Sequence, residues 1–122
     1  MKSFLILCAL LVSFTSCDVP GRLEIVNRTD QTAYYNYLMV NDSGVVDTFN
    51  IEVQGMDEAG ILYGFGWQWN DERIKDYSER IEKIELLSVN DTIVMESQAV
   101  LEEFFTNNRE GLFKKNVRVV FK

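Results

Sequence analysis

Both cysteines of this 122-residue chain, Cys8 and Cys17, lie near its N-terminus, and no cysteine follows Cys17. The long remainder of the chain therefore cannot close a disulfide of its own. Small exported domains often depend on disulfides because their apolar cores are small. This chain must instead be held together by its core alone, so its apolar and aromatic residues are first of all candidates for that core.

The N-terminus has the order of a secretory signal. Lys2 supplies one positive charge, an apolar run covers residues 4–12, and small residues precede Cys17. The run is too short to cross a bilayer core, which requires roughly 20 apolar residues. We therefore predict a signal peptide over residues 1–16. The alternatives are a cleavable signal with an incidental cysteine and an N-terminal membrane anchor.

The segment Phe14-Thr15-Ser16-Cys17 resembles the lipobox of bacterial lipoproteins with a type II signal peptide. Thr15 and Ser16 fit its small-residue positions, whereas Phe14 departs from the usual Leu. A short signal ending in Ser-Cys is similar to that of small Bacteroidota lipoproteins, whose lipobox is looser. The resemblance is limited to residues 1–17. It implies that Cys17 is joined to diacylglycerol, that the chain is cut just before it, and that the new amine is acylated, as with palmitate.

A lipid-bearing Cys17 implies a place in the cell envelope, anchored to a bacterial membrane, with the outer membrane as the expected one. Two or more acyl chains anchor a protein stably, whereas one anchors it marginally. Asp18 is the only acid among the residues just after the cysteine, so the acidic cue of surface-exported Bacteroidota lipoproteins is incomplete. The periplasmic and surface faces both stay open. Residues 17–21 are a predicted tether, and 22–122 a single globular domain.

The charge balance restricts the partners. Removal of residues 1–16 takes away Lys2 and no acid, which leaves 11 basic and 19 acidic residues and a formal net charge of −8. This balance argues against binding to nucleic acid or to an anionic lipid surface, because both require basic patches. We interpret the acidic surface as an ordinary solvated surface.

Short strand-like segments separated by turns dominate the chain. Strands are predicted at 22–26, 33–40, 45–53, 61–69, 93–95 and 117–121. A helix is predicted over 97–105, because Ser97 can cap it and four apolar residues share one face: Val100, Leu101, Phe104 and Phe105. Residues 70–80 fit a loop or a helix capped by Asn70, and a strand at 81–89 follows.

This pattern predicts a mainly β fold. We expect an antiparallel sheet or a small β-sandwich, with one short helix in the C-terminal half. A two-layer α+β domain is the alternative.

The sequence lacks most of the residue types that commonly act in catalysis. There is no histidine, and Cys17 is the only cysteine outside the signal, so the commonest general base and metal ligand are absent. Neighbouring Glu102 and Glu103 diverge on a helix. Asn41 to Asp47 offers oxygens for calcium but lacks the full loop pattern, so a hairpin turn is preferred. We predict no catalytic residue, no metal, no cofactor and no enzymatic activity.

The predicted strand 61–69 places five large residues on one face: Ile61, Tyr63, Phe65, Trp67 and Trp69. One interpretation is a platform on which sugar rings stack, with Trp67 and Trp69 as the stacking residues. The preferred interpretation is that this face belongs to the core, because each buried aromatic side chain removes roughly 150–250 Å² from water. Phe65 is then a core residue, and Trp69, at the strand end, is expected to be the most exposed.

Asp91-Thr92-Ile93 resembles the acceptor pattern of Bacteroidota protein O-glycosylation, and a hairpin tip would expose it. Thr92 is therefore a candidate modification site.

Three functional hypotheses follow. The first is a non-enzymatic, membrane-anchored envelope lipoprotein that binds another protein or supports an envelope assembly. The alternatives are a glycan-binding accessory lipoprotein and a hydrolase with an unrecognised carboxylate pair. The expected partners are the membrane, through the lipid on Cys17, and an envelope protein or a glycan; nucleic acid is not expected.

Overall fold

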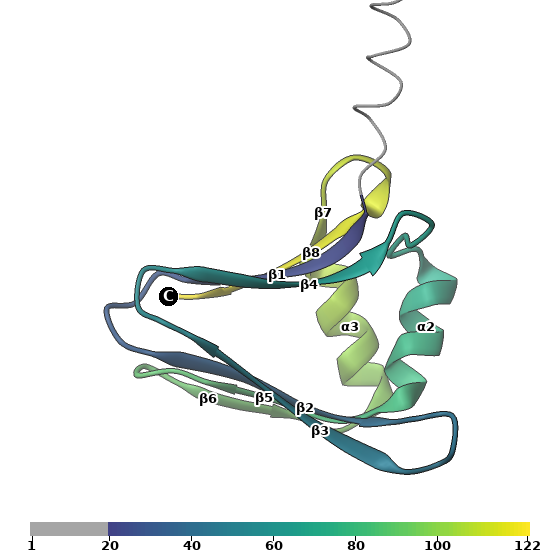
Figure 1. Cartoon of the computed structure of the whole chain (residues 1–122), viewed down its shortest axis with the longest axis horizontal. Helices are drawn as coiled ribbons and strands as arrows, with labels where there is room; N and C mark the ends of the chain where they lie inside the picture. Colours follow the sequence, from purple (N-terminus) through teal and green to yellow (C-terminus); the bar gives the residue numbers. More distant parts are fainter. Residues whose placement is uncertain (1–19) are drawn as a thin grey trace, which may run out of the picture.

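The computed structural model describes residues 20–122. The predicted signal peptide, Cys17 and most of the tether lie outside these residues. The elements, in chain order, are β1 (Gly21–Asn27), β2 (Ala33–Val40), β3 (Val46–Val53), β4 (Glu58–Gly64), α2 (Asp71–Arg80), β5 (Ile81–Leu87), β6 (Thr92–Met95), α3 (Gln98–Asn108), β7 (Arg109–Glu110), the 3₁₀ turn η1 (Leu112–Lys114) and β8 (Asn116–Phe121) (Figure 1). Gly21, expected in the tether, opens β1.

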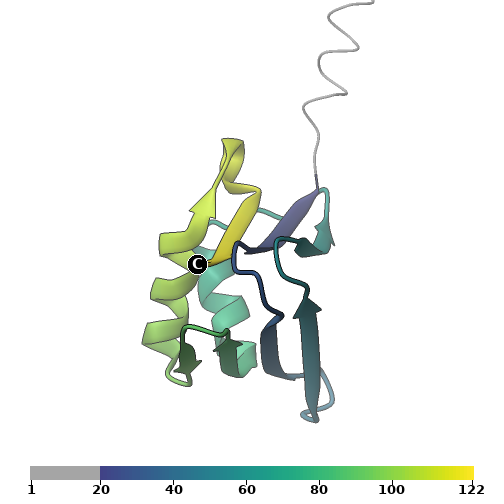
Figure 2. The same cartoon turned by 90° about the vertical axis from the view of Figure 1, so that its left-hand side faces the viewer.

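The strands form two sheets, with the orders β4-β1-β8-β7 and β3-β2-β5-β6. The sheets lie close together at one end and diverge at the other, where α2 and α3 stand between them (Figure 1). The helices lie toward one side of the molecule and strands β1 to β4 toward the other (Figure 2). The predicted mainly β fold is confirmed, with two helices where one was expected.

One strand pair is parallel. β1 pairs with β8 in parallel, from Arg22 opposite Asn116 to Asn27 opposite Phe121, whereas the other pairs are antiparallel. A parallel pair needs a long crossover between its strands, and here nearly the whole domain is that crossover. The first and last strands of the domain thus hold each other at the centre of one sheet.

A buried polar cluster joins the two sheets where they meet. The side-chain amide of Asn27 donates to the carbonyl oxygens of Gln31 (2.7 Å) and Val53 (3.0 Å). Its Oδ1 accepts from the backbone N–H (3.0 Å) and the hydroxyl (2.7 Å) of Thr29. Gly55 lies against the backbone of Asp30, because a Cβ atom added to Gly55 would stand only 2.5 Å from the carbonyl carbon of Asp30. These contacts specify the corners at which the chain changes sheets.

The core lies between the sheets and under the helices. Strand residues whose side chains alternate inward fill the core, as the sequence predicted for 117–121. Its buried members include Leu23, Ile25, Tyr35, Val53, Ile84, Leu86, Val117, Val119 and Phe121.

Both helices start at the predicted caps. The Asn70 side chain accepts from the N–H of Arg73, and that of Ser97 from the N–H of Val100. The helical alternative for 70–80 is therefore correct. Val100, expected on the apolar face of α3, is 46% exposed, because only a narrow stripe of that helix, centred on Leu101 and Phe105, is covered.

The predicted strand 61–69 is wrong in its second half. β4 begins at Glu58 and ends at Gly64, whose φ of +118° favours glycine and turns the chain. The strand alternation stops there. Phe65, expected in the core, is 61% exposed, whereas Trp69, expected to be the most exposed, is fully buried.

None of the helices within residues 20–122 is long and apolar enough to cross a membrane.

Candidate functional site

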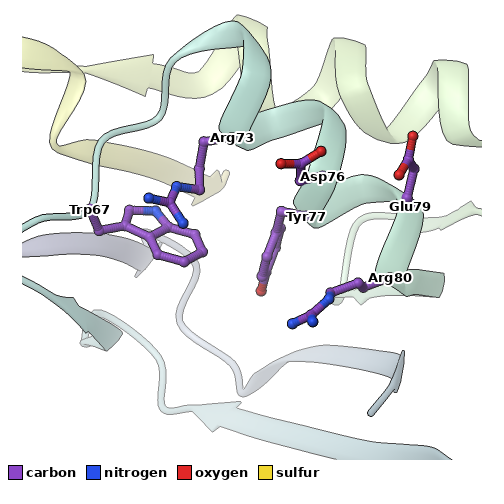
Figure 3. Close-up of a pocket in the computed structure, with 6 residues that line it drawn as sticks. All are labelled: Trp67, Arg73, Asp76, Tyr77, Glu79 and Arg80. Atoms are coloured by element: carbon purple, nitrogen blue, oxygen red, sulfur yellow. The ribbon is translucent and has the colours of Figure 1, made fainter. Parts of the chain in front are cut away.

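A cleft of about 450 Å³ runs along one face of α2. It is lined by Trp67, which precedes α2, and by five residues of the helix: Arg73, Asp76, Tyr77, Glu79 and Arg80 (Figure 3). Residues 73, 76, 77 and 80 have the i, i+3, i+4, i+7 spacing of a single helix face. Sequence reasoning missed this set, although the spacing was present, because residues 70–80 were left open between loop and helix.

Aromatic rings form the inner wall of the cleft. The Trp67 and Tyr63 rings stack with centroids 4.4 Å apart, and Trp67 meets Tyr77 edge-on at 5.8 Å. The hydroxyls of Tyr63 and Tyr77 are hydrogen-bonded at 2.8 Å. Deeper, Trp69 stacks on Phe105 at 5.4 Å. The cleft is therefore built on the rigid aromatic part of the core.

Trp69 does not serve as a stacking residue. Its side chain is fully buried, and its Nε1 donates to the carbonyl oxygen of Arg22 at 2.9 Å. The core interpretation is correct for Trp69, and the expectation that it is exposed is wrong. The reason is the turn after Gly64, which directs the chain back into the space between the sheets before α2 begins.

Trp67 is half-buried, and its ring is already engaged. Besides the stacked Tyr63, the guanidinium carbon of Arg73 lies 4.3 Å from the Trp67 ring centroid, and Figure 3 shows this side chain over the indole. Such a contact is a cation–π interaction. A sugar ring could stack on the Arg73 side of Trp67 only if Arg73 moved away.

The rim of the cleft carries both signs of charge. Arg80 donates to Asp42 in the β2–β3 turn at 2.8 Å, and both side chains are exposed. Asp76 and Glu79 come from the same helix, so they do not face each other across the cleft as the two carboxylates of a glycosidase do. Glu79 also accepts from Gln98 on α3 at 3.4 Å.

Burial raises the pKa of Tyr77 in the cleft and of Tyr63 behind it. Neighbouring phenols raise the pKa of Tyr63 further, whereas the hydrogen bond with Tyr63 partly offsets the rise in the pKa of Tyr77. Both hydroxyls therefore stay protonated at neutral pH. They act there as hydrogen-bonding groups and not as bases.

The remaining predicted sites lie elsewhere. Thr92 is exposed and opens β6 at a hairpin, with its N–H donating to the Asp91 carboxylate at 2.8 Å; its modification stays a prediction. Asn41 Oδ1 accepts from the N–H groups of Ser43 and Val45, as in a hairpin turn. In the part of the chain that the structure describes, no group of three or more Cys, Asp or Glu side chains is placed to hold a metal ion.

The fold and the cleft define a class: a small β-rich domain of two sheets with two helices between them and an aromatic, mixed-charge cleft on one helix. Comparison of the chain with protein-family models, with curated proteins and with solved structures finds no match in any of the three.

Proposed function

We propose that this protein is a non-enzymatic, lipid-anchored envelope protein that binds a partner protein in the cleft along α2. The observation that carries the proposal is the side-chain composition of the cleft. Trp67 and Tyr77 lie at its base, and Arg73 and Arg80 stand beside the acids Asp76 and Glu79. Trp, Tyr and Arg are the residues that carry most binding energy in protein interfaces.

The charges that line the cleft support a protein as its ligand. Two arginines, Arg73 and Arg80, and two acids, Asp76 and Glu79, share this face of α2. Charges of both signs suit a protein surface better than a uniformly charged ligand.

The lipid anchor is supported by the residues before the fold. The segment Thr15-Ser16-Cys17 follows an apolar run, and β1 begins four residues after Cys17.

Fatty-acid labelling in the native host tests the anchor. The wild type and Cys8→Ala should both incorporate a labelled fatty acid, because Cys8 leaves with the signal peptide. Cys17→Ala should not incorporate it. Equal labelling of Cys17→Ala would overturn the lipoprotein part of the proposal.

Site-specific photo-crosslinking tests the partner. A photoreactive amino acid at Asp76, exposed in the cleft, should give a defined protein adduct in intact cells. The same amino acid at Thr106, exposed on α3 and outside the cleft, is the matched control. Arg73→Ala should weaken the adduct at Asp76. No adduct from Asp76, or the same adduct from Thr106, would contradict binding in the cleft.

The glycan-binding alternative rests on Trp67 alone. If Arg73 covers a sugar-binding face, Arg73→Ala should raise affinity for the glycan while lowering it for a protein partner. Titration of both variants with envelope polysaccharide separates the two hypotheses.

A further inference from the structure

Two phenylalanines are exposed at the end of the domain where the described chain begins. Phe65, in the turn after β4, is 61% exposed, and Phe113, in η1, is 62% exposed. Figure 1 places the end of β4 and the η1 loop around the start of β1. Burying a phenylalanine is strongly favourable, so two at one end of a small domain indicate a surface that is covered in the working protein.

Backbone contacts hold these two loops beside the start of β1. Gly21 pairs with Gly64, and the N–H of Arg22 donates to the carbonyl oxygen of Lys115 at 2.8 Å. The ammonium group of Lys115 donates to the carbonyl oxygen of Phe65. The two loops and the N-terminal end of β1 therefore form one continuous surface.

The η1 loop is held in an unfavourable conformation. Phe113 (φ 62°) and Lys114 (φ 53°) are both in the left-handed region, which is costly for residues other than glycine. The N–H of Trp69, a core residue, donates to the carbonyl oxygen of Lys114 at 2.7 Å and so fixes the loop. The fold thus keeps Phe113 exposed at an energetic cost, which is typical of a functional surface.

We propose that Phe65, Phe113, Lys114 and Lys115, the tether-end patch, rest on the bilayer that holds the lipid anchor. The proposal rests on lipidation of Cys17, as proposed above. Gly21 is the fourth residue after Cys17, and four fully extended residues span about 14 Å at most. The patch therefore lies within reach of the membrane surface, whatever path the tether takes.

The chemistry of the patch fits the interface of a bilayer. Aromatic rings enter the boundary between headgroups and acyl chains, and lysines next to them contact lipid phosphates. The net negative charge of the protein opposes broad electrostatic adhesion, but this contact is local and mainly apolar. It fixes the orientation of the domain, because the patch and the anchor together define which end faces the lipid.

A fluorescent probe beside the patch tests this orientation in the processed, full-length protein. With Cys17 acylated, Gly66→Cys introduces the only free thiol, and nothing lies within 4 Å of a Cβ atom at Gly66. Ser43→Cys, in the exposed β2–β3 turn, is the matched control. Both proteins carry a nitrobenzoxadiazole label and are reconstituted in vesicles of phosphatidylethanolamine and phosphatidylglycerol that contain nitroxide-labelled lipid.

The label at position 66 should emit at shorter wavelength and be quenched about twofold more than the label at position 43. Adding Phe65→Ser and Phe113→Ser should remove this difference while the protein stays bound through its lipid. Equal quenching at both positions, with acyl chains present by intact mass, would overturn the patch and leave the proposed function standing. A blue shift without lipid quenching would mean that a second copy of this protein, and not lipid, covers the patch, and would also overturn it. An intact mass without acyl chains would instead overturn the anchor.

Discussion

The phenolic oxygens of Tyr63 on β4 and Tyr77 on α2 lie 2.8 Å apart, in a hydrogen bond that joins the edge of one sheet to the helix beside it. The two rings meet edge-on, with centroids 5.7 Å apart. This bond connects the core to the wall of the cleft, so its loss affects both.

Removal of both hydroxyls should cost less stability than the two single removals added together. Tyr63→Phe or Tyr77→Phe leaves the other oxygen without its partner in a mostly buried place, and each should lower the free energy of unfolding by about 1–2 kcal/mol. The double variant should lose less than the sum, as measured by urea unfolding in a double-mutant cycle. Strict additivity would mean that the two hydroxyls do not interact in solution.

Stability should fall in alkaline solution. Burial raises the pKa of Tyr35, Tyr63 and Tyr77 in the folded protein. The unfolded chain releases these protons from about pH 10, while the folded protein retains them, so stability is full below that pH and is lost as the pH rises. The urea midpoint should therefore drop above about pH 10, and less steeply in the Tyr63→Phe/Tyr77→Phe variant. An equal slope in both proteins would argue against this cause.

Trp69→Ala should destabilise the protein strongly, whereas Phe65→Ala should leave its stability almost unchanged. Trp69→Ala removes a fully buried ring stacked on Phe105 and should cost about 3–5 kcal/mol of stability. Phe65→Ala removes an exposed ring and should change stability by no more than about 0.5 kcal/mol. Thermal and urea unfolding of both variants check this. A severe loss in Phe65→Ala would indicate that the strand continues past Gly64.

Asn27 should be among the most sensitive polar positions. Asn27→Ala deprives the carbonyl oxygens of Gln31 and Val53 of a donor at a buried corner and should cost about 2–3 kcal/mol. Asn50→Ala, at an exposed position of β3, is the control and should be close to neutral. Similar unfolding midpoints for the two variants would show that the corner is held by other contacts.

Thr92 should carry a glycan in the native host. The side chain is exposed at the start of an edge strand, where a modifying enzyme can reach it. Intact mass of the native protein should exceed the mass of the lipidated chain, and Thr92→Ala should remove the excess. A mass accounted for by lipid alone would end this hypothesis.

The sequence by itself determined several of the local elements. The bounds of β2 and the cap of α3 at Ser97 were predicted correctly, because these signals depend on neighbouring residues only. For residues 70–80 it offered the helix capped by Asn70 as one of two alternatives. Alternation also identified the buried side of the last strand.

Only the tertiary structure decided which elements meet. Alternation assigns a residue to a face of a strand but does not name the partner strand, so the parallel pairing of β1 with β8 was beyond prediction. Phe65 is exposed and Trp69 is buried, the reverse of the expectation, because the chain turns at Gly64, whose φ is positive. The cleft arose because Trp67, after that turn, came to lie against one face of α2. Such contacts join residues through the packed core, and no local pattern encodes them.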